Sequence, residues 1–275
     1  NTPNNFLLPF TVEWSSATSG DYLNSHLWNG RIPSTAHSEA KFSAAGAYAV
    51  GFGNTAMSSK LSINAGDVTF NLGTHQYVTG NVNVSSGATF QQNGYLFKFA
   101  DFENHGTYVA SQQSTVVIGN IFSNYGTLVN NGTLNGLELY SSHGSLVTGS
   151  GHFNNNVIIS DDATLAPGNS IGLMTGKLFR LSEDGKFEFE IGSANGVMGT
   201  DWDGLELSSQ LWINSTVANP FQLKLSSMGI LLHDFDASQD YEWAFAVAAG
   251  GIQSFSADKF TIDSSGFLND LAGGS

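Results

Sequence analysis

The sequence predicts an all-β protein, a right-handed parallel β-helix (solenoid) with coils of about twenty residues and a cap at each end. Three observations support this prediction. The 275 residues are 41% hydrophobic but only 12% charged, and 32 are glycine. The remaining polarity comes from Asn, Ser and Thr, which together with Gly favour turns and rank low in helix propensity. A short β-forming element also recurs at regular intervals, and the segments around it alternate apolar and polar residues with period two.

The recurring element is a small turn residue followed by β-forming residues, and its copies lie 18 to 21 residues apart. The copies begin at Gly46, Gly66, Gly87, Gly106, Gly126, Gly144 and Ala163. About twenty residues cannot bury their own apolar face, but stacked copies with strands ~4.8 Å apart can. Parallel connections of this kind are right-handed by default. The alternative fold is a Greek-key sandwich, which lacks a fixed repeat of this length.

The repeat divides the chain into three regions. Residues 41–176 are expected to form the regular solenoid, and residues 177–275 irregular, wider coils with a C-terminal cap. Residues 1–40 precede the repeat and are predicted to be an N-terminal cap, or a donor-strand segment that adds to a neighbouring subunit. The residues expected to mediate that assembly are Phe6, Leu7, Leu8 and Phe10. Because the chain begins at Asn1 rather than Met, an upstream signal peptide is expected to have been removed.

Composition restricts the partners. The formal net charge is −14, and the nine Lys and Arg residues are dispersed, so no nucleic-acid partner is expected. No apolar run approaches the ~20 residues of a membrane span. Cysteine is absent, which excludes disulfides and thiolate metal sites.

Two sets of residues recur at one position of the repeat and are predicted to form ladders along the stack. His105, Tyr125 and His143 each precede a turn glycine and are expected to stack on the surface, as a structural ladder or as a strip for glycan. Asn104 and Asn124 lie one position earlier, with Asn64 at the matching place, and are expected to form hydrogen bonds along the stack.

One segment has the spacing of a calcium site. Asp234, Asp236 and Asp240 place carboxylates at alternate positions, which can wrap one Ca²⁺ ion. The alternative is a solvated strand or a hairpin turn. No other cofactor and no catalytic residue is predicted, because the acidic residues are scattered and no hydrolase, zinc-protease or phosphate-loop motif is present.

The segment Ala163–Gly176, with sequence ATLAPGNSIGLMTG, resembles the "TLxPGNSxGxLT" signature of autotransporter passenger domains. Related exported bacterial β-strand-repeat surface proteins of the PEP-CTERM type share this signature, from which Met174 departs. Residues 200–208 and 241–267 resemble the strand and closing segment that follow it in those families. The resemblance covers roughly residues 100–270 and implies a β-helical, secreted chain at a bacterial cell surface.

The sequence therefore predicts an extracellular structural protein of a bacterial cell surface, matrix or filament, which self-associates into a homopolymer and is not an enzyme. The alternative is a glycan-binding adhesin that uses Tyr125, Trp202 and Trp212. A carbohydrate-active enzyme is a third hypothesis, and it requires a pair of acidic residues facing a groove.

Overall fold

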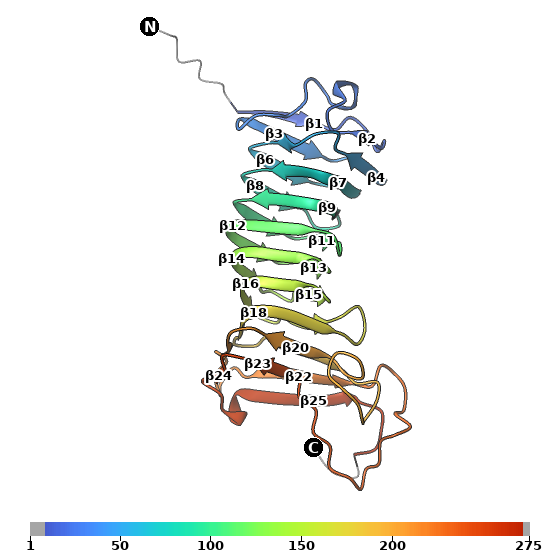
Figure 1. Cartoon of the computed structure of the whole chain (residues 1–275), viewed down its shortest axis with the longest axis vertical. Coiled ribbons are helices and arrows are strands. Elements are labelled where there is room, and N and C mark those ends of the chain that lie inside the picture. Colours follow the sequence, from blue (N-terminus) through green and yellow to red (C-terminus); the bar gives the residue numbers. More distant parts are fainter. Residues whose placement is uncertain (1–8, 272–275) are drawn as a thin grey trace.

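The computed structural model describes residues 9–271, and in it the chain winds into a parallel β-solenoid (Figure 1). Each regular coil contributes one strand segment to each of three stacked sheets. The longer strands bend from one sheet into the next. In strand β9 (Thr89–Phe99), for example, Gly94 makes the bend with φ +103°, and a Cβ there would collide with the backbone of Gly73 in the coil before. All pairings between the named strands are parallel, and the predicted β-solenoid is confirmed.

The three sheets are defined by their hydrogen-bonded neighbours. The first sheet contains β1 (Phe10–Glu13), β3 (Ser38–Phe42), β6 (Lys60–Ile63), β8 (Asn81–Val84), β10 (Asp101–Asn104), the ends of β12 (Thr115–Asn124), β14 (Thr133–Ser141), β16 (His152–Ile159) and β18 (Leu173–Leu181), then β21 (Leu211–Ile213) and β24 (Ile252–Gln253). The second contains β2 (Gly20–Asp21), β4 (Ala47–Gly51), the starts of β7 (Asp67–Val78) and β9 (Thr89–Phe99), then β11 (Thr107–Ala110), β13 (Thr127–Asn130), β15 (Leu146–Gly149), β17 (Thr164–Pro167), β19 (Lys186–Glu190), β22 (Phe221–Ser226) and β25 (Phe260–Gly266). The third contains β5 (Ala56–Met57), the ends of β7 and β9, the starts of β12, β14, β16 and β18, then β20 (Gly204–Leu207) and β23 (Ala246–Ala248). Two 3₁₀ helices, Ser25–Leu27 and Ala257–Lys259, lie outside the sheets.

The register of the second sheet measures the length of each coil. Thr107 pairs with Thr127, twenty residues later, as the sequence repeat predicts. The spacing then grows, because Lys186 pairs with Gln222 and Gln222 pairs with Thr261. The additional residues leave the solenoid as loops, mainly around residues 192–203 and 227–245.

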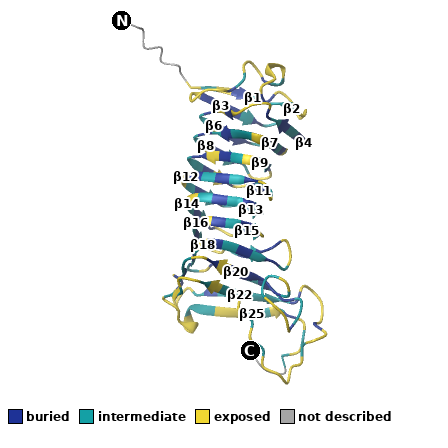
Figure 2. Ribbon diagram, viewed as in Figure 1, coloured by how far each residue is buried: buried dark blue, intermediate teal, exposed yellow. Residues whose placement is uncertain are grey.

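Every second residue of a strand faces inward and fills the interior. The burial of alternate residues along β11 and β13 shows this pattern (Figure 2). Aromatic rings fill the N-terminal half of this core, and Phe102 stacks on Phe122 with ring centres 4.3 Å apart and planes 1° from parallel. Aliphatic side chains such as Leu134 and Val147 dominate the following coils. Identical inward positions therefore stack over one another along the axis.

The N-terminal end of the described chain is closed. Strand β1 pairs with β3 of the same chain, and Phe10 lies opposite Ser38. Just beyond β1, Trp14 and Trp28 pack edge to face with centres 5.0 Å apart, both buried. Phe10 therefore belongs to the sheet of its own chain, whereas Phe6, Leu7 and Leu8 lie outside the described residues.

Candidate functional site

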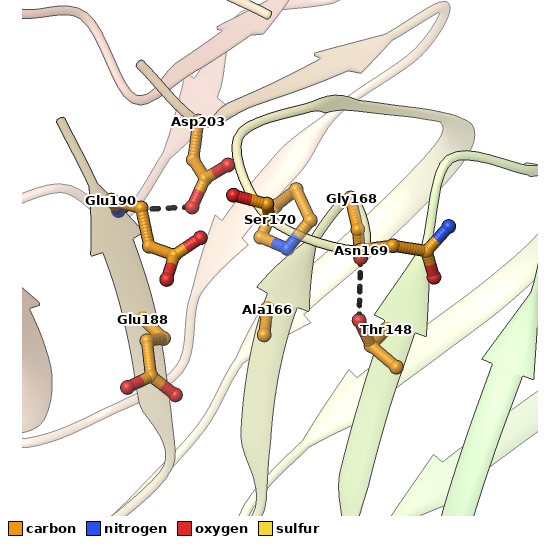
Figure 3. Close-up of a pocket in the computed structure, with 9 residues that line it drawn as sticks. Thr148, Ala166, Gly168, Asn169, Ser170, Glu188, Glu190 and Asp203 are labelled. Carbon is orange, nitrogen blue, oxygen red and sulfur yellow. Dashed lines mark hydrogen bonds between the residues drawn. The ribbon is translucent and has the colours of Figure 1, made fainter. Parts of the chain in front are cut away.

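Three acidic side chains line a hollow under the loop 167–172, within the segment that resembles the passenger-domain signature (Figure 3). The hollow has a volume of about 170 Å³. Its walls come from β15, β17, β19, the loop and the residue just before β20. The lining residues are Thr148, Ala166, Pro167, Gly168, Asn169, Ser170, Glu188, Glu190 and Asp203.

The loop has its shape because its glycines allow close packing. Gly168 has φ +87°, and a Cβ there would collide with the carbonyl oxygen of Ser170. The carbonyl oxygen of Gly168 accepts a hydrogen bond of 2.6 Å from the Thr148 hydroxyl, which Figure 3 shows as a dashed line. The loop thus folds back onto the preceding coil.

Asp203 ties this loop to the next coil. Its side chain is only 1% exposed, and its two oxygens accept backbone hydrogen bonds from Gly172 at 2.8 Å and from Glu190 at 2.9 Å. The peptide N–H of Asp203 also donates to the carbonyl oxygen of Glu190 at 2.9 Å. One buried carboxylate therefore joins the loop, β19 and the start of β20.

Burial raises the pKa of Asp203 to about 7, and the nearby charges of Glu190 and Glu188 act in the same direction. The two backbone N–H groups act in the opposite direction. Burial, followed by the charge of Glu188, also raises the pKa of Glu190. The Glu188 carboxylate lies 3.6 Å from the ammonium group of Lys224. Chemically, Asp203 is a buried carboxyl group that links two segments by hydrogen bonds and gains or loses its proton near neutral pH.

The sequence gives only a partial signal for this site. Asp203 lies in the segment 200–208, which resembles the strand that follows the passenger signature, but its partner Gly172 is 31 residues earlier. Glu188 and Glu190 have no distinguishing motif, since they are ordinary outward positions of an alternating strand.

The surface ladder lies where the repeat places it. The rings of His105 and Tyr125 stack with centres 5.0 Å apart, and Tyr125 meets His143 edge to face at 5.6 Å. The imidazole of His105 also lies 2.7 Å from the carboxylate of Glu103. Both members of that pair are about half exposed, so the pair contributes little to stability.

The asparagine ladder is buried rather than exposed. The Asn104 side-chain amide donates to the Asn124 side-chain oxygen at 2.7 Å, and Asn124 donates in turn to the hydroxyl of Ser141 at 3.0 Å. Asn64 does not belong to this ladder, which corrects the sequence-based assignment. The residue aligned with Asn104 is Val84, and Val84 aligns with Ile63.

The three aspartates proposed as calcium ligands lie in the loop 227–245, and the structure does not bring them together. Asp234 accepts hydrogen bonds from the Ser193 hydroxyl and from the backbone N–H of Ala194, and these hold its pKa well below the usual range. Asp236 accepts from Ser238 within its own turn. Among residues 9–271, no group of three or more His, Cys, Asp or Glu side chains, Asp240 included, is arranged to hold a metal ion.

The tryptophans considered for glycan stacking differ in accessibility. Trp202 is 8% exposed, and its indole N–H donates to the carbonyl oxygen of Ala244, so it belongs to the core rather than to a binding face. Trp212 is partly buried, and the guanidinium of Arg180 lies 5.7 Å from its ring centre. Tyr125 is the one of the three that lies in the surface ladder.

Fold and site together define a parallel β-solenoid, an architecture compatible with the β-helix of autotransporter passenger domains. Comparison of the chain with protein-family models, with curated proteins and with solved structures gave no match. Neither short helix within residues 9–271 has the length and apolarity needed to cross a membrane.

Proposed function

We propose that this chain is an extracellular structural protein of a bacterial cell surface, matrix or filament, and that copies associate through the C-terminal end of the solenoid. The observation that supports it is a gradient of exposure along one inward-facing position. Phe187, Leu223 and Ile262 align in consecutive coils, and they are fully buried, partly buried and 63% exposed, respectively. Within residues 9–271, this inward-facing position is thus open to solvent at Ile262.

The neighbouring sheet repeats the pattern. Leu211 is fully buried, whereas Ile252, which pairs with it in the next coil, is 46% exposed. Within the described residues, β23, β24 and β25 each pair along one edge only (Figure 2 shows the exposed residues there). Unpaired strand edges beside apolar side chains favour addition of further strands. At the N-terminal end β1 and β2 also each pair along one edge only, but Trp14 and Trp28 are buried there.

The resemblance to passenger domains supports the secreted, surface-exposed location, and the uninterrupted stacking of parallel strands supports a structural role. Backbone hydrogen bonds from coil to coil make such a stack stiff along its axis.

The test compares two lysine substitutions at side chains of equal exposure. Ile262→Lys places a charge at the open end, whereas Leu137→Lys places it on the side of the solenoid, where Leu137 is also 63% exposed. Sedimentation velocity and negative-stain electron microscopy are performed over a range of concentrations on both variants and on the unsubstituted chain.

The proposal predicts that the unsubstituted chain and Leu137→Lys associate as concentration rises, and that Ile262→Lys stays monomeric at concentrations at least tenfold higher. A chain that remains monomeric throughout, with normal circular dichroism, would overturn self-association. Association that Leu137→Lys abolishes and Ile262→Lys retains would move the interface to the side of the solenoid.

A further inference from the structure

A second surface hollow adjoins the acidic hollow at Asn169, which lines both, and follows the corner of the solenoid where strands of the second sheet end. Its volume is about 520 Å³. Residues from five successive coils line it, and coils repeat every ~4.8 Å, so the hollow extends roughly 19 Å along the solenoid axis. The lining residues are Gln91, Asn93, Val109, Ser111, Gln112, Gln113, Asn131, Ser150 and Asn169. We call this hollow the amide groove.

The chemistry of the amide groove is uniform. Six of its nine lining residues carry side-chain amides, two are serines, and none is charged. This is unusual for a chain with net charge −14, whose other polar hollows include carboxylates such as Glu190 and Glu103. A side-chain amide offers a donor and an acceptor side by side, which is the complement of a sugar hydroxyl.

One part of the groove is held in place by its own hydrogen bonds. Gln91 donates to the side-chain oxygen of Asn93 at 3.1 Å, and Asn93 donates to that of Asn71, also at 3.1 Å. The side-chain oxygen of Asn131 accepts from the backbone N–H of Ser150 at 3.1 Å. These contacts fix the amides before any ligand arrives, which lowers the entropic cost of binding.

Another part is free to bind. Gln112, Gln113 and Asn169 are exposed, and their side chains form no hydrogen bond with other residues in the described part of the chain. The fixed amides and the free amides face one elongated hollow. This is the arrangement expected of a site for a linear, hydroxyl-rich ligand, in which polar groups recur along the chain at the spacing of the coils.

We propose that the amide groove binds a neutral, unbranched oligosaccharide lying along the solenoid axis. The uncharged lining and the acidic remainder of the chain favour a neutral glycan over a uronate-containing one. This site is independent of the association proposed above, because none of its lining residues belongs to β23, β24 or β25.

The test measures binding by isothermal titration calorimetry with defined hexasaccharides. The neutral probes are the β-1,4-glucan, α-1,4-glucan, β-1,4-xylan and chitin hexamers, and the galacturonate hexamer is the anionic comparison. The variant is Gln112→Ala/Gln113→Ala, which changes two exposed turn residues. The matched control is Asn54→Ala, an exposed turn amide that does not line the groove and whose side-chain oxygen accepts a hydrogen bond from the backbone N–H of Thr55.

We expect at least one neutral hexamer to bind saturably, the double variant to weaken its Kd at least tenfold, and Asn54→Ala to leave it unchanged. Circular dichroism of each variant verifies the fold. Three results would each overturn the proposal: no binding of any neutral hexamer, binding that is unchanged in the double variant, or equally tight binding of the galacturonate hexamer.

Discussion

The buried carboxylate of Asp203 offers the sharpest test of the fold. Asp203→Asn keeps the size of the side chain but replaces one acceptor oxygen with an NH₂ group. In the unsubstituted chain the two oxygens accept the backbone N–H groups of Gly172 and Glu190. In the variant, one of these buried N–H groups faces another donor. Leaving a buried donor without an acceptor costs about 1–3 kcal/mol.

The pH dependence has a definite sign. The pKa of Asp203 is about 7 in the folded chain, whereas an unfolded Asp has a pKa of about 3.9. Between these values the folded chain holds a proton that the unfolded chain has released, so the Asp203 contribution to stability falls as pH rises from about 4 to about 7. At about 1.4 kcal/mol per pH unit over this range, the loss is at most roughly 4 kcal/mol. The Asn side chain does not titrate.

The hydrogen bond lost in the variant and the pH-dependent protonation of Asp203 together predict that the stability difference between the two chains shrinks or reverses as pH rises. Asp203→Asn should be less stable than the unsubstituted chain by about 1–3 kcal/mol near pH 4, and equal to it or more stable at pH 8. The measurement is urea unfolding followed by far-ultraviolet circular dichroism from pH 4 to 8, with Asp67→Asn, an exposed aspartate in β7, as the control. Amide hydrogen exchange at Gly172 and Glu190, compared between the two chains at one pH, reports on the two hydrogen bonds to the Asp203 side chain.

Two results would refute this reasoning. A deficit that stays constant from pH 4 to pH 8 would show that the pKa of Asp203 is not raised by burial. Unchanged exchange at both Gly172 and Glu190 would show that the carboxylate does not hold the loop to β19.

Three further predictions concern the solenoid itself. Replacing Asn104 and Asn124 together with Leu should cost less, in urea unfolding, than the sum of the two single replacements, because each single change leaves one buried atom of the partner amide without the hydrogen bond that joins the two. Phe102→Ala should lower the free energy of unfolding by about 3–5 kcal/mol, since the ring is buried and stacked in the core; a loss below ~1 kcal/mol would contradict the core described here. Glu103→Gln should change stability by less than about 1 kcal/mol, because the pair with His105 is half exposed, and a larger thermal shift would show that this surface pair is coupled to the core.

The sequence by itself determined the architecture and much of the register. Period-two alternation decides which residues face inward, and a repeat of about twenty residues decides which residues lie over one another. These two local properties were sufficient to place His105 beside Tyr125, and Asn104 beside Asn124. Both pairs lie in the stretch where Thr107 and Thr127 are twenty residues apart in register.

The same reasoning failed where the coil length changes by one residue. Ile63 and Val84 align 21 residues apart, whereas Val84 and Asn104 align 20 apart, so Asn64 moves one position away from the asparagine ladder. In a strand, one residue of slip exchanges the inward face for the outward face. The Asn104–Asn124 ladder is therefore buried in the core, and Asn64 is not part of it.

Only the tertiary structure decided the contacts made by the longer loops. Asp234 binds the segment 193–195, about forty residues earlier, and Asp203 binds Gly172, 31 residues earlier. No repeat relates these partners, because the loops that carry them leave the solenoid and return at positions set by packing. A repeating sequence determines which residues of successive coils align. The partners of a non-repeating loop depend instead on where the folded coils place that loop.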